Sequence, residues 1–203
     1  MKKNAQKVNR KPKVKRKNFE FRVIAGDLKG KLIKAPDLGV TRPPLTRLRK
    51  SIFDFLNPHL EYAHYLDLFS GTGSYLFEAV SRGAKSATGV ELEQKIVDAI
   101  NSYSEKYEIA EKLKCINGDV FEMIKYFHSQ KNKFDIIMIA PPQYKDFIKR
   151  TLTLLRQFPI VSEDHLILCQ HDTSETKNLD FTEFEIIQSR KYGNTTFTVL
   201  KLK

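Results

Sequence analysis

The stretch Leu66-Asp67-Leu68-Phe69-Ser70-Gly71-Thr72-Gly73 decides the fold, because it reads as a strand that ends in a glycine-bearing loop. Residues 65–69 form a short apolar and aromatic run, which is typical of a buried parallel strand. Residues 74–82 then resume with apolar side chains at helical spacing. A strand, a glycine turn and a helix in this order form the entry unit of a nucleotide-binding α/β sheet. The two glycines let the backbone pass close to a ligand, although an ordinary tight turn is the alternative.

The residues around this loop narrow the choice of ligand. A dinucleotide-binding loop needs a small residue where this chain has Leu76, and no Gly-Lys-Ser/Thr follows to make a P-loop. Asp67 ends the strand, where its carboxylate would repel a pyrophosphate but would suit a ligand with a cationic centre and an ammonium group. S-adenosylmethionine carries both groups, so the sequence favours this cofactor.

Acidic residues recur where the next strands are expected to end. Glu91 follows the strand expected at 86–90, and Asp119 follows the strand expected at 113–116. Ligands of such sheets bind at the carboxyl ends of the strands, where Glu91 can accept the ribose hydroxyls. Asp119 and Val120 are placed to meet the adenine. Each carboxylate alone is an ordinary surface acid, but three at successive strand ends indicate one pocket.

The charge of the chain is concentrated in its first quarter. The 203 residues suffice for one buried domain with an appendage, and the net charge is +11. Residues 1–50 hold 17 basic and 3 acidic residues, a net +14, whereas residues 51–203 hold 18 and 21, a net −3. This one-sided distribution predicts a polyanionic partner; a solvated tail is the alternative. We expect residues 1–18 to be disordered when free.

The composition also indicates the cellular compartment of the protein. No apolar run approaches the about 20 residues of a membrane span, and the basic N-terminus lacks an apolar segment typical of a secretory signal. Cys115 and Cys169 lie in apolar runs, as buried thiols of a reducing compartment do. The five histidines have no metal-ligand spacing. We therefore expect a cytoplasmic protein without membrane or metal.

The remaining elements follow from periodicity and turn residues. Phe19–Lys34 reads as a β-hairpin with its turn at 26–29, and Thr41-Arg42-Pro43-Pro44 opens a helix that ends near Asn57-Pro58. From residue 65 onward strands and helices alternate, which predicts a mostly parallel sheet with right-handed crossovers. The expected strands are 86–90, 113–116, 134–139 (the most apolar, hence central), 165–169 and the antiparallel pair 184–188 and 196–202; the expected helices are 74–82, 93–107, 120–127 and 144–156.

These residues together resemble a class I S-adenosylmethionine-dependent methyltransferase, and more narrowly the RsmD family of bacterial 16S rRNA guanine-N2 methyltransferases. The resemblance runs from about Arg22 to the C-terminus, and the combination of hairpin, Arg-Pro helix and glycine loop makes it specific. It is carried by Arg22-Val23-Ile24-Ala25-Gly26 with Gly30-Lys31, Thr41-Arg42-Pro43 with Arg47-Leu48-Arg49, Leu66 to Gly73, Glu78-Ala79 with Ser81-Arg82-Gly83-Ala84, and Tyr192-Gly193 with Thr195.

The resemblance implies a Rossmann-like seven-stranded mostly parallel sheet with an N-terminal hairpin and a basic tail. It divides the chain into a tail (1–18), an RNA-binding hairpin and helix (19–60) and a methyltransferase domain (61–203). It also implies S-adenosylhomocysteine as product, small-subunit rRNA or the 30S particle as partner, and a monomer. The implied cofactor residues are Asp67, Phe69, Ser70, Gly71, Thr72, Gly73, Glu91, Leu92, Asp119 and Val120; the implied RNA contacts are Arg22, Lys29, Lys31, Arg42, Arg47 and Arg49.

The catalytic loop is the largest departure from the family. The family has Asp-Pro-Pro followed by an aromatic residue, whereas this chain has Ala140-Pro141-Pro142-Gln143 with Tyr144 one place later. Losing the aspartate removes one hydrogen-bond acceptor for the target amine, which costs roughly 1–3 kcal/mol, or about ten- to a hundredfold in rate. We expect the Pro141 carbonyl and the Gln143 side-chain oxygen to accept instead, and Tyr144 to stack on a flipped base.

Two other functions remain open from the sequence. The first is an RNA-binding assembly factor that keeps the cofactor fold without catalysis, for which Ala140 is the discriminating residue. The second is a methyltransferase that acts on an amine of another nucleic acid, because the loop alone does not choose among amines. The basic residues of the Arg-Pro helix bind phosphates or form a solvated face.

Overall fold

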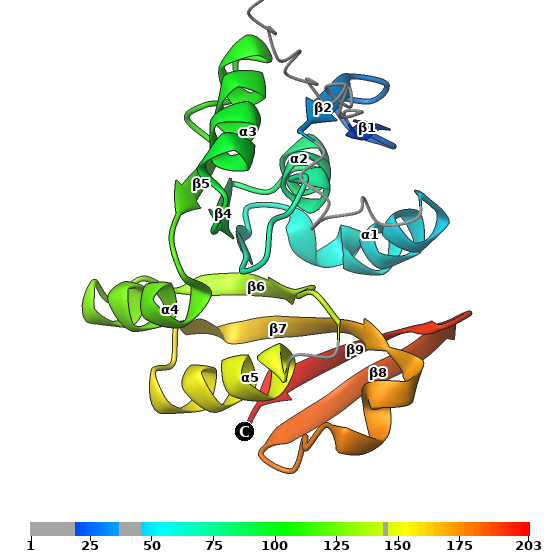
Figure 1. The fold of residues 1–203 in the computed structure, drawn as a ribbon, viewed down its shortest axis with the longest axis vertical. Coiled ribbons are helices and arrows are strands. Elements are labelled where there is room, and N and C mark those ends of the chain that lie inside the picture. Colours follow the sequence, from blue (N-terminus) through cyan, green and yellow to red (C-terminus); the bar gives the residue numbers. More distant parts are fainter. Residues whose placement is uncertain (1–18, 37–45, 144–145) are drawn as a thin grey trace, which may run out of the picture.

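The structure, a computed structural model, describes residues 19–36, 46–143 and 146–203. The predicted basic tail at 1–18, Arg42 and Tyr144 lie outside the described residues. The elements of Figure 1 are β1 (Phe19–Arg22), β2 (Leu32–Ala35), α1 (Thr46–Leu60), β3 (His64–Asp67), α2 (Ser74–Ser81), β4 (Ser86–Glu91), α3 (Gln94–Lys106), β5 (Leu113–Asn117), α4 (Val120–Ser129), β6 (Phe134–Ile139), α5 (Phe147–Gln157), β7 (Val161–Asp172), the 3-10 helix η1 (Thr173–Asn178), β8 (Phe184–Tyr192) and β9 (Thr195–Leu202).

A seven-stranded sheet of order β5-β4-β3-β6-β7-β9-β8 forms the body of the protein, and β1 and β2 form a separate antiparallel hairpin. Strands β3 to β7 pair in parallel, whereas β9 pairs antiparallel with both β7 and β8. The predicted seven-stranded, mostly parallel sheet and its hairpin are therefore confirmed.

Strand β6 lies at the centre of the sheet, as its apolar sequence predicts. Residues 136–139 are at most 1% exposed, because both faces of the strand are covered. Ile136 and Met138 point into one hydrophobic core, whereas Ile137 and Ile139 point into the other. This alternation makes β6 the wall between the two cores.

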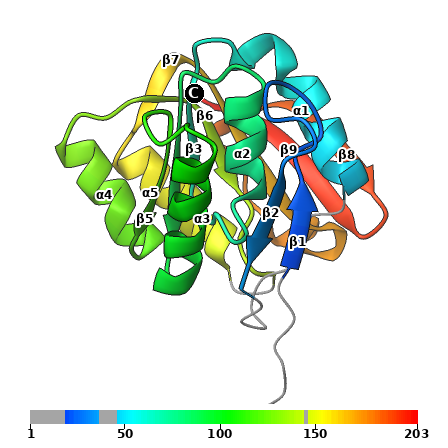
Figure 2. The ribbon, with the colours of Figure 1, turned by 90° about the horizontal axis from the view of Figure 1, so that it is seen from above.

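The two cores lie on opposite faces of the sheet. One contains side chains of α1, α2, α3 and the hairpin, and the other contains side chains of α4 and α5. Figure 2 shows α4 and α5 on one side of the sheet and the hairpin with α1 on the other. Since Phe21 and Leu56 share a core with Phe77 and Leu168, the predicted division at residue 60 does not divide the core. That division stays a proposal about function.

The turn of the hairpin packs against the last residue of α2. Gly26 has φ +80°, and a Cβ there would lie 1.6 Å from the carbonyl oxygen of Ser81. Leu28 N donates to the Ser81 hydroxyl at 2.9 Å, which fixes the turn to the end of α2 remote from the glycine loop. Lys29 and Lys31 therefore lie far from the carboxyl ends of the strands. They are exposed and their RNA contact stays a prediction.

Arg49 corrects the predicted set of RNA contacts. Its side chain is only 2% exposed, with Nε 3.6 Å from Glu78 Oε2. Its Nη2 donates to the carbonyl of Arg22 at 2.5 Å, and its guanidinium lies 5.1 Å from the centre of the Phe21 ring. A charge held in this way is unavailable to RNA, so the prediction for Arg49 was wrong. Arg22 and Arg47 are exposed, and for them the prediction stands untested.

Three element boundaries were also wrong. Helix α1 continues past Pro58 to Leu60, because Leu60 is fully buried and anchors the last turn, whereas the proline removes only one hydrogen bond. Strand β7 extends beyond the predicted 165–169 as far as Asp172, since its antiparallel partner β9 pairs with it to that point. Likewise β8 runs on to Tyr192, which shortens the predicted closing turn.

Within the described ranges, none of the helices has the length and apolar character needed to cross a membrane. Both cysteines are free and buried, as predicted. Burial raises the pKa of the Cys115 thiol to about 12, so this thiol is protonated and unreactive at neutral pH.

Candidate cofactor and substrate site

Asp67 is a buried carboxylate with an unused acceptor at the carboxyl end of β3. It is 0% exposed, and its Oδ2 has no hydrogen-bond partner among the described residues. The other oxygen accepts a long hydrogen bond of 3.4 Å from Phe69 N. Burial raises the pKa of this carboxyl from 3.8 to about 7. An uncompensated buried carboxylate is costly, so this atom fits a cationic ligand.

Glu91 ties the glycine loop to the end of β4. Its Oε2 accepts from Gly71 N at 2.8 Å and its Oε1 accepts from Glu93 N at 3.0 Å. Partial burial raises its pKa, against the effect of these two hydrogen bonds. Each carboxylate oxygen keeps capacity for a further hydrogen bond, such as one from a ribose hydroxyl.

The glycine loop owes its shape partly to packing. Gly73 has φ +76°, and a Cβ there would lie 2.8 Å from Ile100 Cγ1 of α3. The Ser70 hydroxyl donates to the carbonyl of Asp67 at 3.1 Å, which closes the loop on the strand. Thr72 is buried. Gly73 is thus required by the fit of the loop against α3, besides any close approach to a ligand.

Asp119 is the N-cap of α4. Its Oδ1 accepts from Phe121 N at 2.8 Å and from Glu122 N at 3.3 Å. Leu92, which follows Glu91, is 67% exposed, so its side chain is accessible to a ligand at this edge. Because β3, β4 and β5 are adjacent and parallel, the predicted acids Asp67, Glu91 and Asp119 come to one edge of the sheet.

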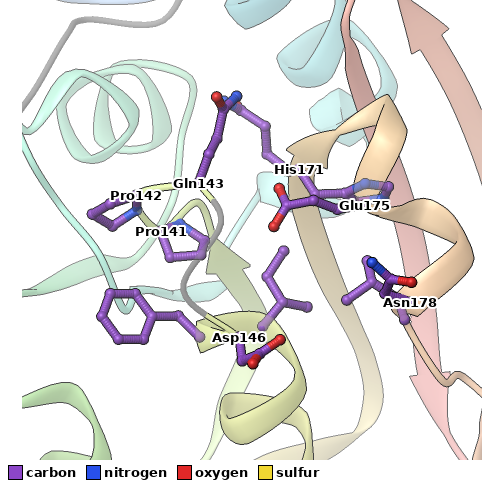
Figure 3. A pocket seen from close by; sticks show the side chains of 11 residues that line it. Pro141, Pro142, Gln143, Asp146, His171, Glu175 and Asn178 are labelled. Carbon is purple, nitrogen blue, oxygen red and sulfur yellow. The ribbon is translucent and has the colours of Figure 1, made fainter.

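A second pocket adjoins the predicted catalytic loop. Ala140 and Pro141 are half-buried after β6, whereas Pro142 and Gln143 are exposed. Figure 3 shows Pro141 beside this pocket, with the carboxylate of Glu175 pointing into it. The lining residues that the sequence analysis missed include Gln170, His171 and Asn178 besides Glu175.

These missed residues come from β7 and η1, where no motif marks them. They reach the catalytic loop because β7 pairs in parallel with β6 and extends to Asp172. Gln170 also connects this pocket to the cofactor side, since its Oε1 accepts a hydrogen bond of 2.5 Å from the hydroxyl of Tyr75 in α2. The long strand β7 is thus what completes the site.

Three phenylalanines connect the strand ends with α5. The ring of Phe69, a predicted cofactor residue, stacks on Phe147 with 5.9 Å between centroids and 16° between planes. Phe147 in turn lies 5.8 Å from the ring of Phe121. The first turn of α5 is therefore held against the end of β3 and the start of α4.

Candidate metal ligands do not cluster among the described residues. In the part of the chain that the structure describes, no three His, Cys, Asp or Glu side chains gather closely enough to hold a metal ion. The prediction of a metal-free site remains a prediction.

The sheet order and the acids at its strand ends define the class I methyltransferase fold. The solved structure of Escherichia coli yhhF shares this fold, with a TM-score of 0.80 and 22% identity over 91% of this chain and 99% of that one. Residues 21–201 match the family described as Conserved hypothetical protein 95. The chain belongs to this family, the RsmD family that its sequence resembles.

Two further proteins are similar to this chain, one in sequence and one in fold. Ribosomal RNA small subunit methyltransferase D of Escherichia coli (strain K12) is 26% identical over 159 residues, which cover 78% of this chain and 77% of that protein. The crystal structure of an RNA methyltransferase from Salinibacter ruber, in complex with S-adenosyl-L-homocysteine, has a TM-score of 0.59 at 12% identity and covers 78% of this chain and 92% of that one.

Proposed function

We propose that this protein transfers a methyl group from S-adenosylmethionine to the exocyclic N2 of a guanine in small-subunit rRNA. The observation that carries the proposal is the buried, unpartnered Oδ2 of Asp67 beside a glycine loop. Membership of the RsmD family and the name of the Escherichia coli relative support the reaction and the substrate. S-adenosylmethionine supplies a methyl group on a sulfonium, which is already a good leaving group.

Each of the proposed cofactor residues contacts a different part of S-adenosylmethionine. Asp67 faces the cationic end, and Glu91 accepts hydrogen bonds from the ribose. Asp119 accepts from the adenine amino group, while Leu92 and Val120 offer apolar surface to the ring. The remaining proposed contacts are Phe69, Ser70, Gly71, Thr72 and Gly73.

The pocket beside the catalytic loop suits a guanine. The target amine is a poor nucleophile because its lone pair is delocalised into the ring, so acceptors must orient it. The Pro141 carbonyl and the Gln143 side chain supply acceptors where Ala140 has none. The Glu175 carboxylate points into the pocket, and its Oε2 accepts from Asp172 N at 3.3 Å in the capping box of η1. A carboxylate has about four acceptor sites, so this group can also accept from the two adjacent N–H donors of the guanine edge, whereas adenine offers a donor beside an acceptor.

Two variants, compared with the parent, test this assignment. Unmodified small subunits are incubated with labelled S-adenosylmethionine, and the labelled base is mapped. We expect Gln143→Ala to lower the rate about ten- to a hundredfold, because one acceptor is lost, and Ala140→Asp to raise it. S-adenosylhomocysteine affinity, measured by calorimetry, serves as the control and stays unchanged. No turnover in the parent, with turnover appearing only in Ala140→Asp, contradicts the role of Gln143.

The same experiment distinguishes the other candidates. A label on adenine contradicts the guanine assignment, and binding of both ligands without label in any variant indicates an assembly factor. The name of the Escherichia coli relative speaks against that inactive alternative. We further propose that the protein acts as a cytoplasmic monomer, with the 30S particle or free rRNA as its substrate.

A further inference from the structure

We propose that a basic groove between α4 and α5 binds phosphates of the RNA substrate, on the face of the sheet opposite to the hairpin. This inference rests on the proposed function and adds an RNA contact outside the basic N-terminal quarter. The α4–α5 groove has a volume of about 320 Å³, and Phe121, Lys125, Asp146, Lys149 and Arg150 are among its lining residues.

The groove concentrates positive charge in a part of the chain that is otherwise acidic. Residues 51–203 carry a net −3, yet Lys125, Lys149 and Arg150 line this groove, and Asp146 is the one acid among its described lining residues. Lys125 pairs with Glu122 at 2.9 Å. In the described part of the chain Lys149 and Arg150 form no ion pair, although both are exposed. Their charge is therefore available to an anion.

Arg150 is held in a fixed position before any ligand arrives. Its guanidinium carbon lies 3.6 Å from the centre of the Phe121 ring, and Phe121 is only 5% exposed and contacts Phe147. A stacked guanidinium keeps its N–H edge free for two parallel hydrogen bonds to a phosphate. Because the side chain is already ordered, binding costs less conformational entropy than it does at a mobile surface arginine.

The groove adjoins the proposed guanine pocket, because the two share a lining residue. Asp146 lines both the groove and the pocket beside the catalytic loop. A flipped base in that pocket would place neighbouring phosphates of its strand at the start of the groove. The hairpin turn with Lys29 and Lys31 is fixed to the far end of α2 on the opposite face of the sheet, so the groove would be an RNA contact separate from these lysines (Figure 2).

The test compares two double variants of the full-length protein. The groove variant is Lys149→Ala with Arg150→Ala. The control variant is Lys85→Ala with Lys112→Ala, which removes two exposed charges at the opposite edge of the sheet, just before β4 and β5. Affinity for unmodified small-subunit rRNA is measured over a series of salt concentrations, together with S-adenosylhomocysteine affinity and thermal stability.

We expect the groove variant to bind rRNA about tenfold more weakly at low salt, with S-adenosylhomocysteine affinity and thermal stability unchanged. The slope of log affinity against log salt should fall by about 0.7–0.9 for each phosphate that the variant no longer neutralises. The control variant should keep most of the affinity. Equal losses in both variants, or none in the groove variant while the parent methylates rRNA, overturn the groove alone. A parent that neither binds nor methylates rRNA overturns the proposed function.

Discussion

Asp67→Asn is expected to weaken S-adenosylmethionine binding by about 100-fold or more while making the free protein more stable at pH 8. The side chain is 0% exposed and its Oδ2 has no partner among the described residues, so the carboxylate is positioned for a ligand at a cost to the fold. Removing one partner of a buried charge pair typically costs 2–5 kcal/mol of binding, or roughly 30- to several thousandfold. The amide keeps the shape and loses the charge.

The stability effect follows from the pKa of Asp67. Burial raises this pKa from 3.8 to about 7, so between these values the folded protein binds a proton that the unfolded chain releases. Stability contributed by this group is therefore fully present below about pH 4 and is lost as pH rises to about 7. The full shift corresponds to at most about 4 kcal/mol. Asp67→Asn removes this loss, so its advantage in unfolding free energy appears at pH 8 and disappears at pH 4.

The same pKa couples cofactor binding to a proton. A cationic ligand favours the ionised carboxylate, so binding releases protons below about pH 7 and the affinity of the parent falls as pH decreases. Calorimetry in two buffers of different ionisation enthalpy measures this release. Asp164→Asn is the control, because its side chain is 99% exposed. Parent-like affinity in Asp67→Asn would contradict the assignment of Asp67 to the cofactor.

Glu78→Ala is expected to lower the free energy of unfolding by about 3–5 kcal/mol, because it leaves a buried arginine without its counter-charge. Glu78 is fully buried and joins the hairpin, α1 and α2: it accepts from Ile24 N at 3.0 Å and Ala25 N at 3.2 Å, and it pairs with Arg82 at 2.9 Å and Arg49 at 3.6 Å. For a chain of this size the loss shifts the melting temperature by roughly 6–20 °C.

A double-mutant cycle with Arg49→Ala separates the pair from the rest of the network. The cost of Arg49→Ala should be smaller when Glu78 is already alanine, with a coupling of about 0.5–3 kcal/mol. Lys50→Ala, on the exposed neighbour of Arg49, should change stability by no more than about 1 kcal/mol. Unchanged stability in Arg49→Ala would contradict the structural role of the buried pair.

The carboxyl-edge part of the site was largely predictable from the sequence. Asp67 and its glycine loop are marked by a local break from strand to helix, and Glu91 and Asp119 each follow an apolar run. Each of these signals is contained in a few consecutive residues, so it can be recognised without knowledge of the packing. Parallel pairing of adjacent strands then brings the three acids together.

The substrate side was not predictable in the same way. Glu175 and Gln170 lie about 30 residues beyond the catalytic loop, in no recognisable motif, and only the length of β7 brings them there. Arg49 was misjudged for a related reason: an arginine is normally exposed, and its partner Glu78 belongs to a different helix. A pattern along the chain does not specify which charges become paired in the interior.

The sequence by itself determined the alternation of strands and helices, the central apolar strand and the acids at the strand ends. These features depend on the spacing of apolar residues and on the positions of glycines, both of which involve residues that are close together in the chain. The tertiary structure alone decided that one oxygen of Asp67 has no partner among the described residues, that Arg49 is buried against Glu78, and that Arg150 stacks on Phe121 at the edge of a basic groove. Those outcomes depend on which surfaces pack together, and packing joins residues whose separation in the chain carries no local signal.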